Sequence, residues 1–115
     1  MIVCTKHMFS SAHCLDKYDG VCQQIHGHNY VLEVSINGSV DPKTGMVMDF
    51  IVLEQLVDKH IISILDHRNL SEIIDCPTAE NISIWIWDTL KPVLPRLEEI
   101  VLHETPQYCV VYRGE

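Results

Sequence analysis

An alternating run at residues 29–37 constrains the fold more than any other part of the chain. A period of two is typical of a β-strand with one buried face, and we expect this strand to span residues 28–39. The apolar positions of the run are Tyr30, Leu32, Val34 and Ile36. His26 and His28 share their parity, and Gly27 between them adds no bulk, so both imidazoles would open the buried face. Unpaired polar groups are costly there, so the two histidines need partners.

A metal ion is the partner that this pattern favours, with His13 a short way upstream as a third ligand. Three imidazole nitrogens leave a tetrahedral zinc ion one open position, which is the plan of a catalytic rather than a structural site. We therefore expect one Zn²⁺ per chain, bound by His13, His26 and His28. The alternative is chance, because the chain has seven histidines and a single H-x-H pair is often a coincidence.

A cysteine, Cys22, stands close to this motif, with three residues between it and His26. A thiol in this place could take protons from whatever fills the open position of the metal, so Cys22 is a candidate general base. Alternatively, Cys22 is itself the fourth ligand, since zinc accepts Cys and His alike, and the site is then a closed structural one.

Composition sets the broad class of the protein. A chain of 115 residues with 47% hydrophobic content suits one domain, residues 1–115. A formal net charge of −8 argues against a nucleic-acid groove, which needs clustered Lys and Arg. No apolar run approaches the roughly 20 residues of a membrane span. Five scattered cysteines form no disulfide framework, so we expect a cytoplasmic protein.

Three further segments have the pattern of β-strands. We expect a strand over residues 2–9 that runs on toward His13, and two closing strands at residues 98–104 and 109–113. The segment Asp41–Gly45 contains Pro and Gly at positions that favour a turn. We expect residues 46–48 to return from this turn as a hairpin partner.

Two helices are predicted between the strands. Asp49 is a good N-cap for the first helix, and Thr78, after Pro77, is a good N-cap for the second, which Pro92 ends. Apolar residues repeat at helical spacing in both segments. In the first they are Phe50, Leu53, Leu56, Val57, Ile61, Ile64 and Leu65, and in the second they are Ile82, Trp85, Ile86 and Leu90.

The order of elements is ββααββ. It predicts an α+β fold in which an antiparallel four-stranded sheet carries both helices on one face. So small a sheet has open edges, and edge-to-edge assembly into a larger oligomer would cover them.

Asp66 and His67 follow the first predicted helix, where its pattern breaks. A carboxylate beside an imidazole can set its tautomer, and an imidazole near a thiol can receive its proton. The alternative is a solvated Asp–His pair in a loop.

Glu104 shares the parity of Ile100 and Leu102, so it would point to the apolar face at the end of a strand. A buried carboxylate needs a partner with two N–H groups, and the amino-pyrimidinone edge of a pterin or a guanine offers them. The alternative is an ordinary strand-end carboxylate in solvent.

Several motifs together resemble the 6-pyruvoyltetrahydropterin synthase family, in the same order and from Phe9 to the C-terminus. They are the C-x-x-x-H-G-H motif, Val40–Gly45, Leu65-Asp66-His67, Pro77-Thr78-Ala79-Glu80, Trp85–Asp88 and Val111–Glu115. The resemblance implies the tunnelling fold, in which subunit sheets join into a barrel, trimers stack into a hexamer, and active sites lie at subunit interfaces.

The resemblance also implies the role of each site residue. It makes a pterin triphosphate the substrate, and it assigns the residues to three groups. These are the zinc ligands His13, His26 and His28; the general base Cys22 with its relay partners His67 and Asp66; and the pterin anchor Glu104, with Thr78 and Ala79 near the ring.

Within the family, three residues between Cys22 and His26 suit the branch that makes 6-carboxy-5,6,7,8-tetrahydropterin for queuosine synthesis. A branch that makes 6-hydroxymethyl-dihydropterin carries a glutamate where this chain has Gln23 and Gln24, and is disfavoured. Two alternatives stay open: a synthase that stops at the 6-pyruvoyl product, and a non-catalytic, zinc-stabilised pterin-binding module. The pattern does not indicate which of the eight Lys and Arg would bind a triphosphate.

Overall fold

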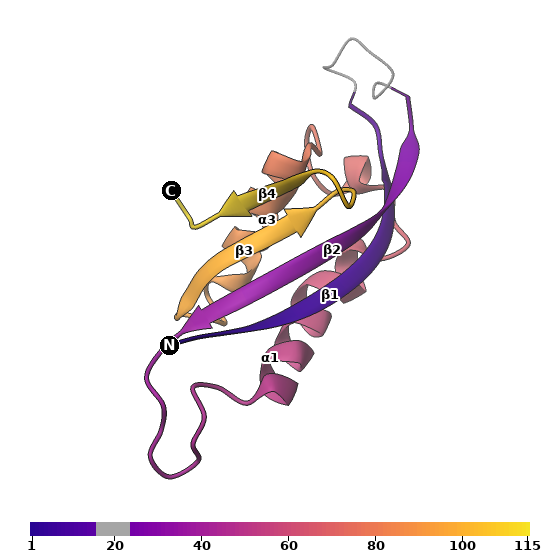
Figure 1. The fold of residues 1–115 in the computed structure, drawn as a ribbon. Coiled ribbons are helices and arrows are strands. Elements are labelled where there is room, and N and C mark those ends of the chain that lie inside the picture. Colours follow the sequence, from indigo (N-terminus) through magenta and orange to yellow (C-terminus); the bar gives the residue numbers. More distant parts are fainter. Residues whose placement is uncertain (16–23) are drawn as a thin grey trace.

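A computed structural model describes residues 1–15 and 24–115 of the chain. The fold is built on an antiparallel sheet with the strand order β1-β2-β3-β4 (Figure 1). Its two long strands, β1 (Ile2–His13) and β2 (His26–Asn37), pair along their whole length, and β3 (Leu97–His103) and β4 (Cys109–Tyr112) complete it. The predicted α+β class and the four-stranded antiparallel sheet are therefore confirmed.

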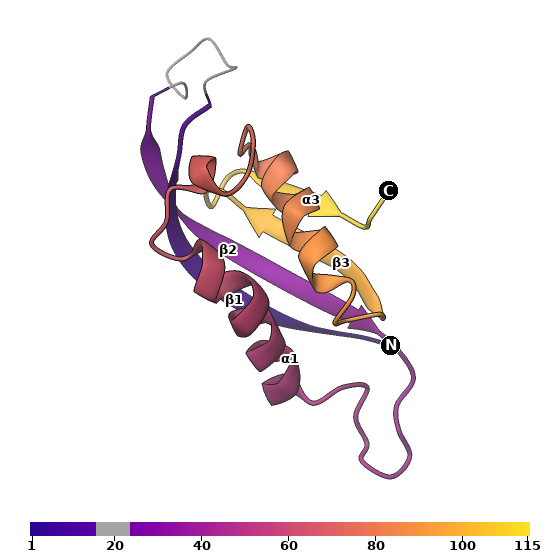
Figure 2. The same cartoon turned by 180° about the vertical axis from the view of Figure 1, so that it is seen from behind.

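Both helices lie on one face of the sheet, as the ββααββ order predicts (Figure 2). Helix α1 (Phe50–Val57) continues through a π-helical turn, η2 (Asp58–Ile62), into α2 (Ser63–Leu65), and packs behind β1. After a 3₁₀ turn, η3 (Leu70–Glu72), helix α3 (Ala79–Leu90) packs behind β3 and β4. None of the helices in residues 1–15 and 24–115 has the length and apolar character needed to cross a bilayer.

The alternation of β2 supplies four residues of the core, beside Phe9 of β1 and Leu97, Ile100 and Leu102 of β3. Tyr30, Leu32, Val34 and Ile36 are all buried against the helices, each at most 1% exposed. Because side chains on one face of a strand are two residues apart, His26 and His28 open the same face.

The buried stripe of the first helix has a wider spacing than an ideal α-helix. Leu53, Val57, Ile61 and Leu65 are fully buried and recur every four residues. A step of four turns an α-helix about 40° past a full turn, and the wider η2 turn absorbs part of this drift. Phe50 was also predicted in the stripe, but it is 58% exposed because it lies on the first turn, before the helix reaches the sheet core.

The predicted hairpin strand at residues 46–48 is wrong. The segment forms bends, and the loop closes on itself through a hydrogen bond from the Asp41 N–H to the Met46 carbonyl at 2.9 Å. Strand β2 pairs with β1 on one edge and β3 on the other, so no edge remains for a third partner.

Strand β1 is longer than the predicted 2–9, because its pairing with β2 continues to His13. Its outer edge is partly covered by residues 66–69. The His67 N–H donates to the Ser10 carbonyl at 2.7 Å, and the Ala12 N–H donates to the Arg68 carbonyl at 3.0 Å. A parallel bridge between Ala12 and Asn69 continues this contact.

The N-cap of α1 gives a test of the helical layer. The Asp49 carboxylate accepts the Ile51 N–H at 2.8 Å, so Asp49→Ala should lower the free energy of unfolding by about 0.5–2 kcal/mol. Urea unfolding followed by circular dichroism measures it. Asp49→Asn keeps an accepting oxygen and is the control. Equal losses in both variants would mean that charge, not the cap, matters at this position.

Candidate active site

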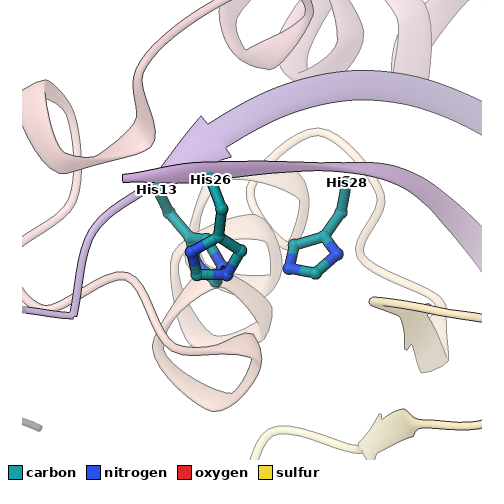
Figure 3. A group of neighbouring side chains, drawn as sticks. All are labelled: His13, His26 and His28. Carbon is teal, nitrogen blue, oxygen red and sulfur yellow. Dashed lines mark hydrogen bonds between the residues drawn. The ribbon is translucent and has the colours of Figure 1, made fainter. Parts of the chain in front are cut away.

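Three histidines meet where the first two strands come together. His13 ends β1, His26 begins β2, and the two are directly paired, while His28 follows two residues later on the same face. Figure 3 shows all three rings on one side of the two strands. One ring nitrogen from each lies within 4.8 Å of the others, which is the spacing of a metal-binding group. The structure therefore brings together the three predicted ligands.

Hydrogen bonds fix which nitrogen of two of these rings faces the cluster. His13 Nδ1 lies 2.7 Å from the Pro77 carbonyl, and His26 Nδ1 lies 2.7 Å from the Gln24 carbonyl. A carbonyl can only accept, so both Nδ1 atoms carry hydrogen and, in neutral rings, both Nε2 atoms carry lone pairs. These two Nε2 atoms are 2.9 Å apart. Facing lone pairs repel unless a proton or a metal ion lies between them.

The third nitrogen of the cluster is buried and has no hydrogen bond within the described residues. This atom, His28 Nε2, has the Glu104 Oε1 atom 3.5 Å away. Burial lowers the pKa of His28, the Glu104 carboxylate opposes this shift, and His13 and His26 add to it. A neutral imidazole is the form that binds metal. The three rings thus fit a zinc ion, and the backbone carbonyls hold two of them in the orientation it requires.

Glu104 lies beside the histidine cluster, just beyond β3. Its Oε1 atom is 3.3 Å from His13 Nε2, and its side chain is 25% exposed. The backbone N–H of Glu104 donates to the Tyr108 carbonyl at 3.1 Å, which fixes the turn into β4. The predicted direction of this side chain, toward the apolar face, agrees with its place in the structure. The alternative of a carboxylate in open solvent does not.

Glu104 also lines a hollow of about 220 Å³ together with Thr78 and Ala79. The structure thus brings together the three residues expected to contact a pterin. Among the other residues that line the same hollow are Glu80 and Tyr108, which were not singled out in the sequence. The sequence held a signal for Glu80, which follows Ala79 in the Pro77-Thr78-Ala79-Glu80 motif. The alternation of β4 held no signal for Tyr108.

Asp66 and His67 form a pair at the edge of β1. Asp66 Oδ1 accepts the Ser10 N–H at 2.9 Å, and Oδ2 lies 2.9 Å from His67 Nδ1. The Ser10 N–H, and then the His67 hydrogen bond, lower the pKa of Asp66. His67 is exposed, has a positive φ of 58°, and lines a second hollow of about 470 Å³ with His28. Within the described residues, the pair makes no direct contact with the three-histidine cluster.

Cys22 lies outside the described residues, as does Gln23, so its role as general base or fourth ligand stays a prediction.

The Tyr30 hydroxyl is a polar group that the sequence pattern placed in the core and not in the site. It is buried, and no protein group in the described ranges hydrogen-bonds it. Its ring lies 5.6 Å from that of His28 and 6.1 Å from that of His13. Burial, with Glu104 adding, raises the pKa of Tyr30, so the hydroxyl stays a donor at neutral pH. The signal for this in the sequence was that Tyr30 lies on the same face of the strand as His26 and His28.

The metal assignment is tested by zinc content. Purified protein should hold about one zinc per chain, and His28→Ala should lose most of it, because removing one of three nitrogens opens the coordination shell. Metal analysis after dialysis against a weak chelator measures this. Full zinc occupancy in His28→Ala would refute the assignment.

A second variant tests whether Cys22 is a zinc ligand or only a thiol near the metal. Cys22→Ala should keep its zinc if the three histidines suffice, and His60→Ala, on η2, is the control for the loss of an imidazole elsewhere. Loss of zinc in Cys22→Ala would instead make Cys22 the fourth ligand of a structural site.

Comparisons with known proteins show the family of the chain. The family model described as 6-pyruvoyl tetrahydropterin synthase matches residues 2–115. The chain is 41% identical over 133 aligned residues to the 6-pyruvoyl tetrahydrobiopterin synthase of Dictyostelium discoideum, covering 100% of this chain and 97% of that one. It is 41% identical over 91 residues to the dihydroneopterin monophosphate aldolase of Pyrococcus furiosus, covering 76% and 77%.

A solved structure confirms the fold. The 6-pyruvoyl tetrahydropterin synthase of Caenorhabditis elegans superposes with a TM-score of 0.86 and 32% sequence identity, covering 100% of this chain and 97% of that chain. Sequence and fold agree over the whole length, and the chain belongs to the 6-pyruvoyl tetrahydropterin synthase family.

Proposed function

We propose that the protein is a zinc-dependent lyase that converts 7,8-dihydroneopterin triphosphate to 6-carboxy-5,6,7,8-tetrahydropterin, acetaldehyde and triphosphate, in the pathway to queuosine. The observation that carries this proposal is the contact of Glu104 with both the histidine cluster and the hollow of Thr78 and Ala79. A carboxylate for a pterin ring and three ligands for a metal ion are thereby held side by side.

The anchoring role of Glu104 follows from hydrogen-bond geometry. An ionised carboxylate accepts two adjacent N–H groups, and the amino-pyrimidinone edge of a pterin presents such a pair. With the ring in the hollow of Thr78 and Ala79, the side chain of the substrate extends toward the three imidazoles. Bound there, zinc supplies Lewis-acid polarisation of the side-chain hydroxyls.

Proton transfer is assigned to Cys22, with His67 and Asp66 as relay partners. A thiolate at Cys22 takes protons from the carbon atoms of the substrate side chain, and the imidazole of His67 receives them. Asp66 orients that imidazole, because its Oδ2 atom lies 2.9 Å from His67 Nδ1. In residues 1–15 and 24–115 the relay pair makes no direct contact with the histidine cluster, so the proposal places His67 at a site completed by a neighbouring subunit.

The assembly proposed is a hexamer of two stacked trimers, in which sheets join at their edges into a barrel. Strands β1 and β4 are the outer strands of the sheet, and such pairing would use β4 and the part of β1 that residues 66–69 do not cover. The face of the sheet away from the helices carries exposed apolar side chains that assembly would cover, including Met8 (68% exposed) and Val111 (48%).

The reaction balances without an external oxidant or reductant. Loss of triphosphate leaves a ketone in the side chain, and tautomerisation moves the reducing equivalents into the ring to give a diketone at the tetrahydro level. Water then adds to the carbonyl next to the ring, and cleavage between the two carbonyl carbons gives the 6-carboxylate and acetaldehyde.

A second candidate is the 6-pyruvoyl product, which forms when the reaction stops before carbon–carbon cleavage. The name of the Dictyostelium relative favours it. That alignment needs 133 positions for the 115 residues of this chain, so the relative has segments that this chain lacks, in keeping with the short Cys22–His26 spacing. The name of the Pyrococcus relative, an aldolase, supports carbon–carbon cleavage on a related scaffold.

Product analysis tests the proposal. Purified zinc-loaded protein incubated with 7,8-dihydroneopterin triphosphate should release triphosphate and acetaldehyde in equal amounts, with 6-carboxytetrahydropterin identified by mass. Triphosphate without acetaldehyde would establish the 6-pyruvoyl candidate. Release of neither would refute both.

The Glu104 anchor has its own test. In Glu104→Gln one accepting oxygen becomes a donor that meets the N–H groups of the pterin, so pterin binding should weaken by about 2–4 kcal/mol. Zinc content should not change, because Glu104 is not a ligand. Equilibrium binding of neopterin measures the effect, and Glu98→Gln, exposed on β3, is the matched control. Equal neopterin affinity in the two variants would mean that the ring is held elsewhere.

A further inference from the structure

Two buried side-chain atoms in residues 1–15 and 24–115 have no hydrogen-bond partner, and they lie on neighbouring side chains of one strand face. They are His28 Nε2 and the Tyr30 hydroxyl, and the two rings are 5.6 Å apart. A metal ion at the histidine cluster would satisfy His28 Nε2, which offers it a lone pair. The Tyr30 hydroxyl is a donor and needs an acceptor instead, because burying a hydroxyl without a partner costs stability.

Packing holds the Tyr30 ring in one position. The ring stacks on Phe9, with centroids 4.9 Å apart and planes only 10° from parallel. The rings of His13 and His28 lie edge to face with it, at 6.1 Å and 5.6 Å. Tyr30 itself has no exposed surface. Its hydroxyl is therefore a fixed donor beside the metal ligands.

Glu104 is the carboxylate placed to accept from this donor. The pairing of β2 with β3 sets Val31 opposite His103, so the next residues, Tyr30 and Glu104, are cross-strand neighbours. Burial raises the pKa of Tyr30, and the Glu104 carboxylate adds to the rise, as a nearby negative charge does. The Glu104 side chain is 25% exposed and has three rotatable bonds, so it can move toward a donor that is held in place.

The same carboxylate lies within reach of the metal. Its Oε1 atom is 3.3 Å from His13 Nε2 and 3.5 Å from His28 Nε2, on the two imidazoles that flank Tyr30. Zinc binds carboxylate oxygens as well as imidazole nitrogens. In the described part of the chain, these rings are the only side-chain donors near the Glu104 carboxylate. Unless a further donor holds it, Glu104 can enter the open position of the metal, and it would then no longer bind a pterin.

We infer that Tyr30 is a positioning residue, whose hydroxyl donates a hydrogen bond to the Glu104 carboxylate in the metal-loaded protein and keeps it out of the coordination shell. The inference rests on the proposed function for the anchoring role of Glu104. It deepens that function, because it assigns the group that separates the pterin anchor from the metal. A hydrogen bond to an ionised acceptor is among the stronger ones, and partners of this kind orient the groups around a metal.

The test uses cobalt(II), which binds the same ligands as zinc and whose visible absorption depends on the number and geometry of its ligands. Tyr30→Phe removes the hydroxyl and keeps the ring. Its cobalt spectrum should differ from that of the wild type, because the Glu104 carboxylate enters the coordination shell. Glu104→Gln should keep the wild-type spectrum, and the double variant, Tyr30→Phe with Glu104→Gln, should return to it.

Binding of neopterin to the cobalt-loaded proteins is the second readout. Tyr30→Phe should bind neopterin about tenfold more weakly, because the metal holds the anchoring carboxylate. Tyr112→Phe is the matched control and should change neither readout, since its hydroxyl donates to the Glu115 carbonyl at 3.1 Å. Without metal, Tyr30→Phe should melt no lower than the wild type, because its hydroxyl has no partner in the described residues.

Several outcomes overturn the inference. A wild-type cobalt spectrum in Tyr30→Phe would show that the hydroxyl does not restrain Glu104, whether or not neopterin affinity falls. An altered spectrum that persists in the double variant, or that Tyr112→Phe shares, would show that Glu104 is not the entering group. A lower melting temperature of metal-free Tyr30→Phe would show that the hydroxyl already has a partner.

Failure of the proposed function gives a different result. A wild-type protein that neither binds neopterin nor turns over the substrate would refute that function. The cobalt spectra need no pterin, so they would still decide whether Tyr30 restrains Glu104.

Discussion

The pairing of β1 with β2 is the constraint on which the rest of the site depends. The register that places Ile2 opposite Asn37 also places His13 opposite His26, at the far end of a twelve-residue ladder. A shift of one residue would turn every side chain of one strand to the other face. The burial of Tyr30, Leu32 and Val34 opposes such a shift, because their apolar surface would enter water. The hydrophobic core thus sets the positions of the metal ligands.

The smaller hollow and the histidine cluster share one carboxylate. Glu80 and Glu104 make the hollow acidic, which favours a ring with several N–H donors. The Glu104 Oε1 atom also lies 3.3 Å from His13 Nε2 and 3.5 Å from His28 Nε2, so the group suited to such a ring is held against the three imidazoles.

Alternation and capping were the reliable signals in the sequence, because each depends on a few neighbouring residues. They located β2, both N-caps, and the shared face of His26, His28 and Glu104. They failed where partners come from distant segments. Residues 46–48 have strand-like composition, but both edges of β2 were already paired. The carbonyls of Pro77 and Gln24, which orient two imidazoles, carry no residue-type signal at all. The hollow at His67 exists only because residues 66–69 fold back along β1.

The π-helical turn η2 is the place where the first helical segment can lose a residue. A deletion in a regular α-helix rotates all that follows by about 100° and shifts it by about 1.5 Å, which here would take Asp66 away from the Ser10 N–H. A π-turn is equivalent to one residue inserted into an α-helix. Deleting one residue within Asp58–Ile62 would therefore restore regular α-helical geometry and leave the segment that follows close to its present place.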